Sequence, residues 1–275
     1  MNIIHENSTA LITGGARGIG KGIALSLARR NIRIISLDIL DEENEATVKE
    51  LNSLSGGGAV GYHCDLSNPK EISDVINEIL SKENIDILVN NAGIFIANSY
   101  LKGTYEEALE IFDKQMAVNA RATYLCVKKI APHMVSRGGG HILNIITNHL
   151  KRELFRPSRS EQAYDASKWA QYELNESMNR ELIEYNIKVN ALCPAATRTP
   201  MLQGFFDDYG LPLNRENVHK VTHFDSLLEI EDVGEAAWNI LNWDDSQPTG
   251  KAYLLIYKED CESLANGHNE ALLIK

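Results

Sequence analysis

The chain has 275 residues, 44% of them hydrophobic and 24% charged, and a formal net charge of -11 at pH 7. This acidic balance disfavours contact with nucleic-acid phosphates. No apolar run approaches the roughly 18 residues of a membrane-spanning helix. The start of the chain lacks the pattern of a signal peptide, so we expect a cytosolic protein with no membrane partner. The cysteines lie far apart and form no CxxC pair, which predicts free thiols and no metal site; they are Cys64, Cys126, Cys193 and Cys261.

Short apolar runs alternate with longer helical patterns along the chain. We expect buried parallel strands at residues 9–13, 32–38, 59–65, 85–91, 141–147, 187–193 and 251–257. Helices are expected near 18–30, 42–54, 69–83, 104–135, 161–185 and 230–243, the third beginning at an Asn68-Pro69 cap. This alternation predicts an α/β fold: a Rossmann-type doubly wound parallel sheet of about seven strands with helices on both faces. We assign residues 1–275 to one domain.

The first expected strand runs into a glycine-rich turn, TGGARGIG at residues 13–20, and then into a helix. Glycines permit a tight turn and let the backbone approach a pyrophosphate, which the helix N-terminus attracts. A sharp strand-to-helix turn also needs glycines for structural reasons alone. In this context nucleotide binding is the favoured interpretation, with Gly14, Arg17, Gly18, Ile19 and Gly20 in the cofactor loop.

The second expected strand ends at Asp38, 20 residues after Gly18. A carboxylate at this place accepts hydrogen bonds from ribose hydroxyls and repels a 2′-phosphate. The next residue is Ile39, which offers a phosphate no positive charge. We therefore expect NAD in preference to NADP, although Arg17 and Arg33 leave NADP open.

Further segments complete an ordered pattern along almost the whole chain. They are Cys64-Asp65-Leu66, Asn90-Asn91-Ala92-Gly93, Tyr164-Asp165-Ala166-Ser167-Lys168 and Asn190-Ala191-Leu192-Cys193-Pro194. Together with the glycine turn they resemble the short-chain dehydrogenase/reductase family. The resemblance implies that Asp65 binds the adenine ring and that Leu66 beside it also belongs to the cofactor site. It also implies that Asn91, Ala92 and Gly93 lie beside the cofactor.

The same resemblance places a loop over the nicotinamide after Pro194. Thr197 is expected to contact the carboxamide through its backbone, and Thr199 the carboxamide or pyrophosphate. Family members usually have glycine after the proline, whereas Ala195 stands here. Alanine stiffens the loop but does not argue for lost activity.

Two YxxxK matches occur, Tyr124/Lys128 and Tyr164/Lys168. Both fall in expected helices, where residues four apart share a face. The first pair has no strand just before it and is interpreted as a packed aromatic and an exposed lysine. The second follows the fifth strand, at the carboxyl edge of the sheet where such folds bind ligands. We therefore predict Tyr164 and Lys168 as catalytic and cofactor-binding residues.

Tyrosine has a pKa of about 10 and is a poor base at neutral pH. An ammonium one helical turn away favours the phenolate, so Lys168 is expected to lower the pKa of Tyr164. The resemblance adds Asn119, which would support a water-linked proton relay to Lys168. Thr147 falls where the family usually has a catalytic serine; it supplies the same hydroxyl, or it is simply a strand-end threonine. Asn148 and Ser160 are weaker candidates.

The segment 195–228 is predicted to form a substrate lid. Its aromatic residues line an apolar pocket or form the packing core of the lid; they are Phe205, Phe206, Tyr209 and Phe224. His219 and His223 are four apart, but without a carboxylate motif nearby we do not predict metal binding. Residues 258–275 are predicted to trail beyond the last strand as a tail.

The loop 148–161 is the basic part of an acidic chain. It carries Lys151, Arg152, Arg156 and Arg159. Arginine suits anionic groups because its fork makes two hydrogen bonds, so this loop binds an anionic substrate group, or it is a solvated loop or subunit contact.

The function predicted from the sequence is NAD-dependent interconversion of a small secondary alcohol and a ketone, with Tyr164 as general acid/base. The competing hypotheses are an isomerase or dehydratase of the extended branch of the superfamily, and a non-catalytic NAD-binding sensor or scaffold. The resemblance also implies a homotetramer or dimer built on helices 104–135 and 161–185.

Overall fold

The computed structural model describes residues 4, 7–54, 58–151, 161–222, 226–243, 248–265 and 273–274, with backbone alone at 221 and 222. Its strands form one parallel sheet in the order β3-β2-β1-β4-β5-β6-β7. They are β1 (Thr9–Thr13), β2 (Arg33–Asp38), β3 (Ala59–His63), β4 (Ile87–Asn90), β5 (Gly140–Ile145), β6 (Ile187–Pro194) and β7 (Ala252–Leu255). The predicted doubly wound Rossmann-type fold is confirmed, and the strand order reverses between β1 and β4.

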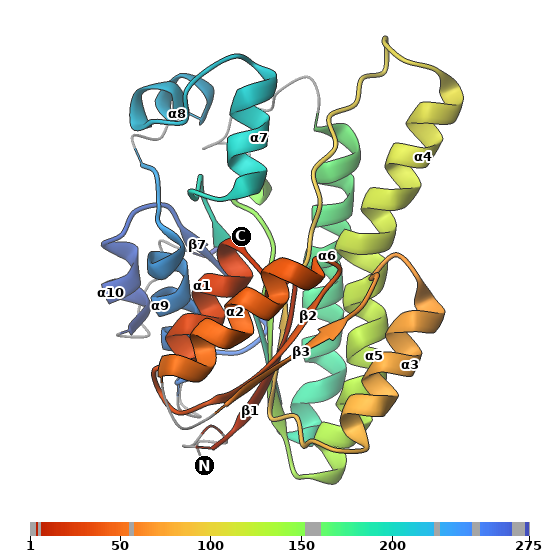
Figure 1. The fold of residues 1–275 in the computed structure, drawn as a ribbon, viewed down its shortest axis with the longest axis vertical. Helices are drawn as coiled ribbons and strands as arrows, with labels where there is room; N and C mark the ends of the chain where they lie inside the picture. Colours follow the sequence, from red (N-terminus) through yellow and green to blue (C-terminus); the bar gives the residue numbers. More distant parts are fainter. Residues whose placement is uncertain are drawn as a thin grey trace.

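The helices of the described residues cover both faces of this sheet (Figure 1). They are α1 (Gly18–Ala28), α2 (Asp41–Leu54), α3 (Pro69–Leu80), α4 (Tyr105–Gln115), α5 (Ala122–Ser136), α6 (Gln162–Leu182), α7 (Pro200–Asp208), α8 (Arg215–Thr222), α9 (Ile230–Leu241) and α10 (Asp260–Ala265), with a π-helix η1 (Met116–Arg121) and 3₁₀ turns η2 (Asn148–Leu150) and η4 (Ile183–Tyr185). The predicted cap of α3 is confirmed, because the Asn68 side chain accepts hydrogen bonds from the N–H groups of Lys70 and Glu71. None of these helices combines the length and apolar character needed to cross a bilayer.

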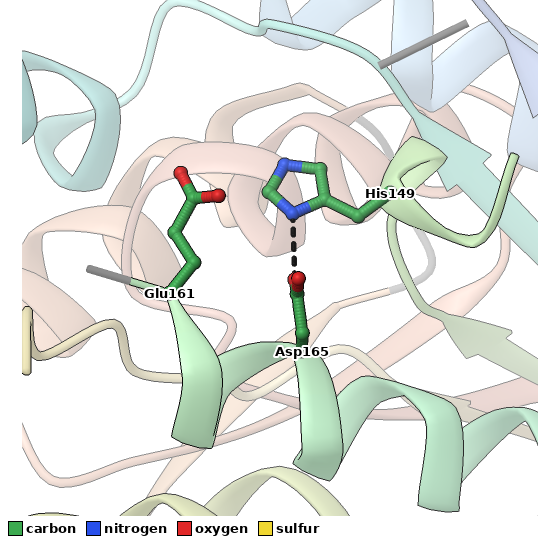
Figure 2. A group of neighbouring side chains, drawn as sticks. All are labelled: His149, Glu161 and Asp165. Carbon is green, nitrogen blue, oxygen red and sulfur yellow. Dashed lines mark hydrogen bonds and ion pairs between the residues drawn. The ribbon is translucent and has the colours of Figure 1, made fainter. Parts of the chain in front are cut away.

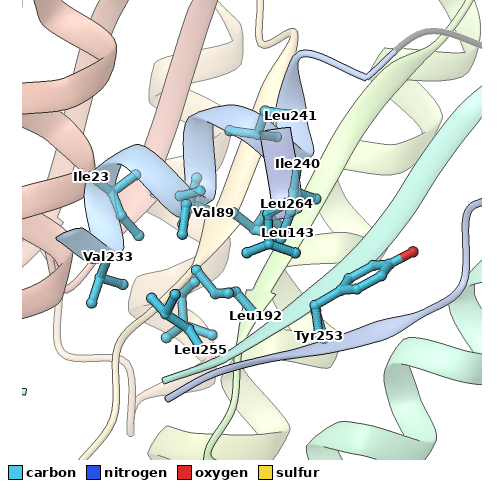
Figure 3. Close-up of a cluster of buried hydrophobic side chains, with 14 of the residues drawn as sticks. Ile23, Val89, Leu143, Leu192, Val233, Ile240, Leu241, Tyr253, Leu255 and Leu264 are labelled. Atoms are coloured by element: carbon cyan, nitrogen blue, oxygen red, sulfur yellow. The ribbon is translucent and has the colours of Figure 1, made fainter. Parts of the chain in front are cut away.

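Two hydrophobic layers sandwich the sheet. Along β1, Ala10 and Ile12 belong to the layer under α1 and α9, whereas Leu11 belongs to the layer under α3, α5 and α6. Figure 3 shows the first layer, where α9 side chains meet those of β4, β5, β6 and β7. Helices α1 and α9 touch backbone to backbone, since a carbon added at Gly22 would lie 2.2 Å from the carbonyl oxygen of Ile230. Burial on both faces explains why the strands are apolar throughout.

Several predicted elements differ in the structure. The helix expected at 104–135 is three segments, because the π-helix η1 interrupts it. Strand β3 is an edge strand that is only partly buried, so the expected burial on both faces is wrong there. The lid segment contains α7 and α8. The expected tail is ordered where described: α10 packs Leu264 into the core, and Leu273 pairs with Tyr253.

Candidate active site

Two cavities lie side by side at the carboxyl ends of the strands, where β1 and β4 diverge. The larger cavity, of about 500 Å³, follows the glycine turn and the ends of β2, β3 and β4. The smaller cavity, of about 160 Å³, lies under α7. Both are lined by Tyr164, Ile19, Ile146, Thr199 and Met201. Tyr164 therefore stands at the junction between them.

The glycine turn leaves no room for side chains at its bend. Gly14 has a φ of +68°, and a carbon added to it would lie 2.9 Å from the Cα of Ala92. A carbon on Gly20 would lie 2.0 Å from the carbonyl oxygen of Gly14. The side-chain amide of Asn91 donates hydrogen bonds to the carbonyl oxygens of Thr13 and Gly14, each at 2.9 Å. The backbone is thus drawn into a bare cradle, which fits a pyrophosphate.

Most predicted cofactor residues line the two cavities. Those of the larger cavity are Gly14, Arg17, Gly18, Ile19, Asp38, Asp65, Leu66, Asn91, Ala92, Gly93, Tyr164, Lys168 and Thr199. Pro194 and Thr197 line the smaller one. Gly20 lines neither and packs beneath the turn, so its part is to let the helix approach the strand. Ala195 extends the sheet, since its N–H donates to the Leu255 carbonyl oxygen at 2.8 Å.

The carboxylate of Asp38 is held at the edge of the larger cavity. It accepts hydrogen bonds from the N–H groups of Ala16 at 3.0 Å and Leu40 at 3.1 Å, and the residue is 8% exposed. Arg33, at the opposite end of the same strand, pairs with Glu83 through Nε at 3.1 Å. The possibility that Arg33 meets a cofactor phosphate, which the sequence left open, is therefore not supported, since Arg33 does not line the cavity. Arg17 does line the cavity, and its Nη1 atom lies 3.9 Å from Glu43 Oε1.

Tyr164, Lys168 and Thr147 meet where β5 ends and α6 begins. Thr147 and Tyr164 both line the smaller cavity, and their hydroxyl groups lie close enough to influence each other. The Lys168 ammonium lies 5.9 Å from the centre of the Tyr164 ring and donates to the Ile145 carbonyl oxygen at 3.1 Å and to Gln171 Oε1 at 3.0 Å. The sequence prediction that these three residues come together is supported by this geometry.

Burial controls the protonation of this pair. It lowers the pKa of Lys168 from 10.5 to about 8. It also raises the pKa of Tyr164 well above 10, against a smaller opposing effect of the Thr147 hydrogen bond. The expectation that the Tyr164 pKa is lowered is therefore wrong, because desolvation of the phenolate outweighs a distant ammonium. At neutral pH the Tyr164 hydroxyl is therefore protonated.

Asn119 lies in the π-helix η1 and is fully buried. Its side chain accepts from the Ile94 N–H at 2.8 Å and donates to the Ile94 carbonyl oxygen at 3.0 Å and to Ser167 Oγ at 2.9 Å. A carbon added at Gly93 would lie 3.5 Å from both Asn119 Oδ1 and Lys168 Nζ. Asn119 and Lys168 thus flank one narrow space, and the proton relay between them stays a prediction.

Comparison with known proteins settles the family. A family model described as short chain dehydrogenase matches residues 8–210. The chain belongs to the short chain dehydrogenase family. One relative in this family, 2-(R)-hydroxypropyl-CoM dehydrogenase from Xanthobacter autotrophicus, is 33% identical over 72% of this chain and 78% of its own length. The protein is therefore an oxidoreductase of the short chain dehydrogenase family, and the fold of this family binds a nicotinamide cofactor.

Two solved structures of similar fold differ in their cofactors. A 7α-hydroxysteroid dehydrogenase complexed with NADH and 7-oxo glycochenodeoxycholic acid is 26% identical, with a TM-score of 0.80 over 93% of this chain and 95% of that one. A 3-oxoacyl (acyl-carrier-protein) reductase from Agrobacterium tumefaciens C58 with NADP bound is also 26% identical, with a TM-score of 0.79 over 92% and 95%. Proteins of this fold therefore include one that binds NADH and one that binds NADP.

The other YxxxK pair, Tyr124/Lys128, lies away from both cavities. Tyr124 is 49% exposed on α5, and Lys128 is exposed beside it. The expectation of a packed aromatic at Tyr124 is wrong, because this face of α5 points away from the sheet. Position relative to the strands, and not the motif, distinguishes the two pairs.

The lid aromatics divide between the two predicted roles. Phe205 lines the smaller cavity and meets Phe95 at 5.8 Å between ring centroids. Phe206 also borders it, but is 1% exposed and packs with Val218 and Leu227. Tyr209 is 55% exposed. Predictions at Arg152, Arg156, Arg159, Ser160, His223 and Phe224 lie outside the described residues.

Sequence reasoning missed the polar corner of the smaller cavity, which we define as His149, Glu161 and Asp165 (Figure 2). His149 Nδ1 lies 2.9 Å from Asp165 Oδ1, and the His149 ring centroid lies 5.7 Å from that of Tyr164. A metal-ligating atom from each of the three side chains lies within 4.8 Å of the others. The available signal was proximity in sequence, since His149 follows Thr147 by two residues and Asp165 follows Tyr164 directly.

Proposed function

We propose that this short chain dehydrogenase interconverts a secondary alcohol and a ketone with NAD(H), and that Tyr164 is its general acid/base. The observation that carries the proposal is the position of Tyr164 at the junction of the two cavities, with Thr147 and the Lys168 ammonium beside it. The nicotinamide ring, when bound, donates or accepts the hydride. The protein must then manage the proton on the substrate oxygen.

In the reducing direction the Tyr164 hydroxyl donates its proton to the carbonyl oxygen as the carbon gains hydride. The Thr147 hydroxyl donates a hydrogen bond to the same oxygen and orients it. The buried Lys168 ammonium stabilises the phenolate that remains. A proton from bulk solvent then restores the Tyr164 hydroxyl by way of the space that Lys168 and Asn119 flank. In oxidation the same groups act in reverse, with the phenolate as base.

NAD is proposed over NADP because of the charges at the end of β2. The fixed carboxylate of Asp38 would face a 2′-phosphate. Arg33 is paired with Glu83 at the far end of the strand and cannot neutralise that phosphate. The basic side chains that line this cavity are Arg17, Lys114 and Lys168. Arg17 is the one on the glycine turn, and its neighbour Glu43 opposes its charge.

The test is Tyr164→Phe, with Tyr124→Phe as the matched control. Removing the proton donor should lower kcat/KM for ketone reduction about 10²–10⁴-fold. The control should match wild type, because Tyr124 is exposed and lines neither cavity. NADH affinity, measured by fluorescence, shows whether the Tyr164→Phe cavity still binds cofactor. A wild-type protein that binds NADH but reduces no ketone would instead support the sensor hypothesis.

We also propose a homo-oligomer that uses α4. Its outer face exposes Tyr105, Leu109 and Phe112 at 78%, 48% and 44%. An apolar strip of this kind favours contact with a second copy of the chain. Light scattering on the purified protein tests this; a monomer at micromolar concentration refutes it.

A further inference from the structure

The smaller cavity has one apolar wall and one polar corner. The wall is formed by Phe95, Met201, Leu202 and Phe205. Beside Tyr164 and Thr147, the lining includes His149 and Glu161 of the polar corner. Glu161 is only 6% exposed and stands directly before the first residue of α6. A carboxylate is rarely buried at such a place unless hydrogen-bond donors meet it.

Asp165 determines what His149 offers to the cavity. The Asp165 carboxylate lies one helical turn after Glu161 and meets His149 Nδ1 at 2.9 Å (Figure 2). An ionised carboxylate only accepts hydrogen bonds, so Nδ1 carries the proton. In the neutral ring Nε2 is then an acceptor. Asp165 is thus a positioning residue for His149.

The polar corner therefore presents acceptors and negative charge. Glu161 has two oxygens with several acceptor positions, so a hydrogen bond within the protein still leaves positions for a ligand. We propose that Glu161 and His149 bind a second polar group of the substrate, and that this group is a hydrogen-bond donor: a hydroxyl or an ammonium. This inference rests on the proposed ketone reduction and names its substrate class as hydroxylated or aminated ketones.

An anionic substrate group does not fit this corner. Two carboxylates, Glu161 and Asp165, would repel it at short range. The proposal is therefore opposed to the anionic substrate that the basic residues of 148–161 indicated, of which only Lys151 lies among the described residues. A substrate hydroxyl would bind without adding charge to the cavity, whereas a substrate ammonium would make a charge-assisted hydrogen bond with Glu161.

Four aryl ketones of one skeleton test the proposal: acetophenone, α-hydroxyacetophenone, α-aminoacetophenone and phenylglyoxylate. The wild-type protein should reduce the hydroxy or amino ketone with a higher kcat/KM than acetophenone, and phenylglyoxylate least well. Glu161→Gln keeps the size of the side chain and removes its charge. It should lower the kcat/KM ratio of the preferred ketone to acetophenone about ten- to a hundredfold, chiefly through KM. Glu173→Gln, on the exposed face of the same helix, should keep the wild-type ratio.

The outcomes separate the possible explanations. If Glu161→Gln lowers kcat/KM more for the amino ketone than for the hydroxy ketone, the corner binds an ammonium. If it lowers kcat/KM more for the hydroxy ketone, the corner binds a hydroxyl. Equal wild-type kcat/KM for the four ketones, an unchanged ratio in Glu161→Gln, or a preference for phenylglyoxylate overturns the proposal. If EDTA abolishes the preference and Mn²⁺ restores it, the corner holds a divalent cation and direct binding is overturned. A protein that binds NADH but reduces none of the four refutes the proposed function itself.

Discussion

Lys168 should make the stability of the protein depend on pH in a way that its replacement by methionine removes. The residue is 4% exposed, and burial lowers its pKa from 10.5 to about 8. This difference corresponds to about 3 kcal/mol of destabilisation while the folded protein carries the charge. Below pH 8 the ammonium is present in both the folded and unfolded states, so the penalty is complete.

The penalty should disappear as pH rises. Between pH 8 and 10.5 the unfolded state binds more protons at Lys168 than the folded state, so the free energy of unfolding increases with pH. Relative to Lys168→Met, wild type should therefore gain about 2.5 kcal/mol between pH 7 and pH 10. Methionine leaves Gln171 Oε1 and the Ile145 carbonyl oxygen without this donor, but that loss is the same at every pH.

Urea unfolding followed by circular dichroism at several pH values from 7 to 10 measures the difference between the two proteins. Titrations of all other groups are common to both and cancel. Lys128→Met is the matched control: its side chain is exposed, so its difference from wild type should not change with pH. A Lys168→Met difference that is equally flat would refute the assignment of Lys168 as a buried, desolvated ammonium.

Substitutions at three further positions test the site. Thr147→Ser should keep most of the activity, whereas Thr147→Val should lose about 10²–10³ in kcat, because valine keeps the shape but removes the donor; a tolerated valine would move the hydroxyl role to another residue. Asp38→Ala should reduce the preference for NAD over NADP about fivefold by relieving a repulsion on the order of 1 kcal/mol; kcat/KM for both cofactors decides this, and a wild-type preference for NADP contradicts it. Gly93→Ala should leave Tm nearly unchanged, since its methyl meets Asn119 and Lys168 at ordinary contact distance, but should lower kcat about tenfold or more by filling the space between them; an unchanged kcat argues against the relay.

Local sequence was sufficient for the features whose cause is local. Alternating apolar runs and helical patterns predicted the parallel sheet, because strands buried on both faces must be apolar throughout. The cap at Asn68 and the glycine turn are likewise set by neighbouring residues. Chain order identified Tyr164 over Tyr124, since the first follows a strand at the carboxyl edge and the second does not. These predictions needed no knowledge of distant contacts.

Features that depend on burial or on meetings between distant segments were not predictable in this way. The pKa of Tyr164 is raised because the fold removes water from the phenol, an effect that the motif alone does not reveal. Arg33 lies at the end of β2 away from the cofactor cavity, where it pairs with Glu83, 50 residues along the chain. The break at η1 presents Asn119 to Ile94 and Ser167, which are contributed by other elements.

The sequence by itself determined the family, the fold class, the glycine cradle and which YxxxK pair lies at the cavities, because each is encoded in ordered local motifs. Only the tertiary structure decided the polarity of the substrate cavity. It brought Glu161 and Asp165, at the start of α6, against His149 after β5, and it enclosed them beside Tyr164. The physical reason is that a charged side chain acquires its chemical role from the water it loses and the partners it meets, and both are set by packing.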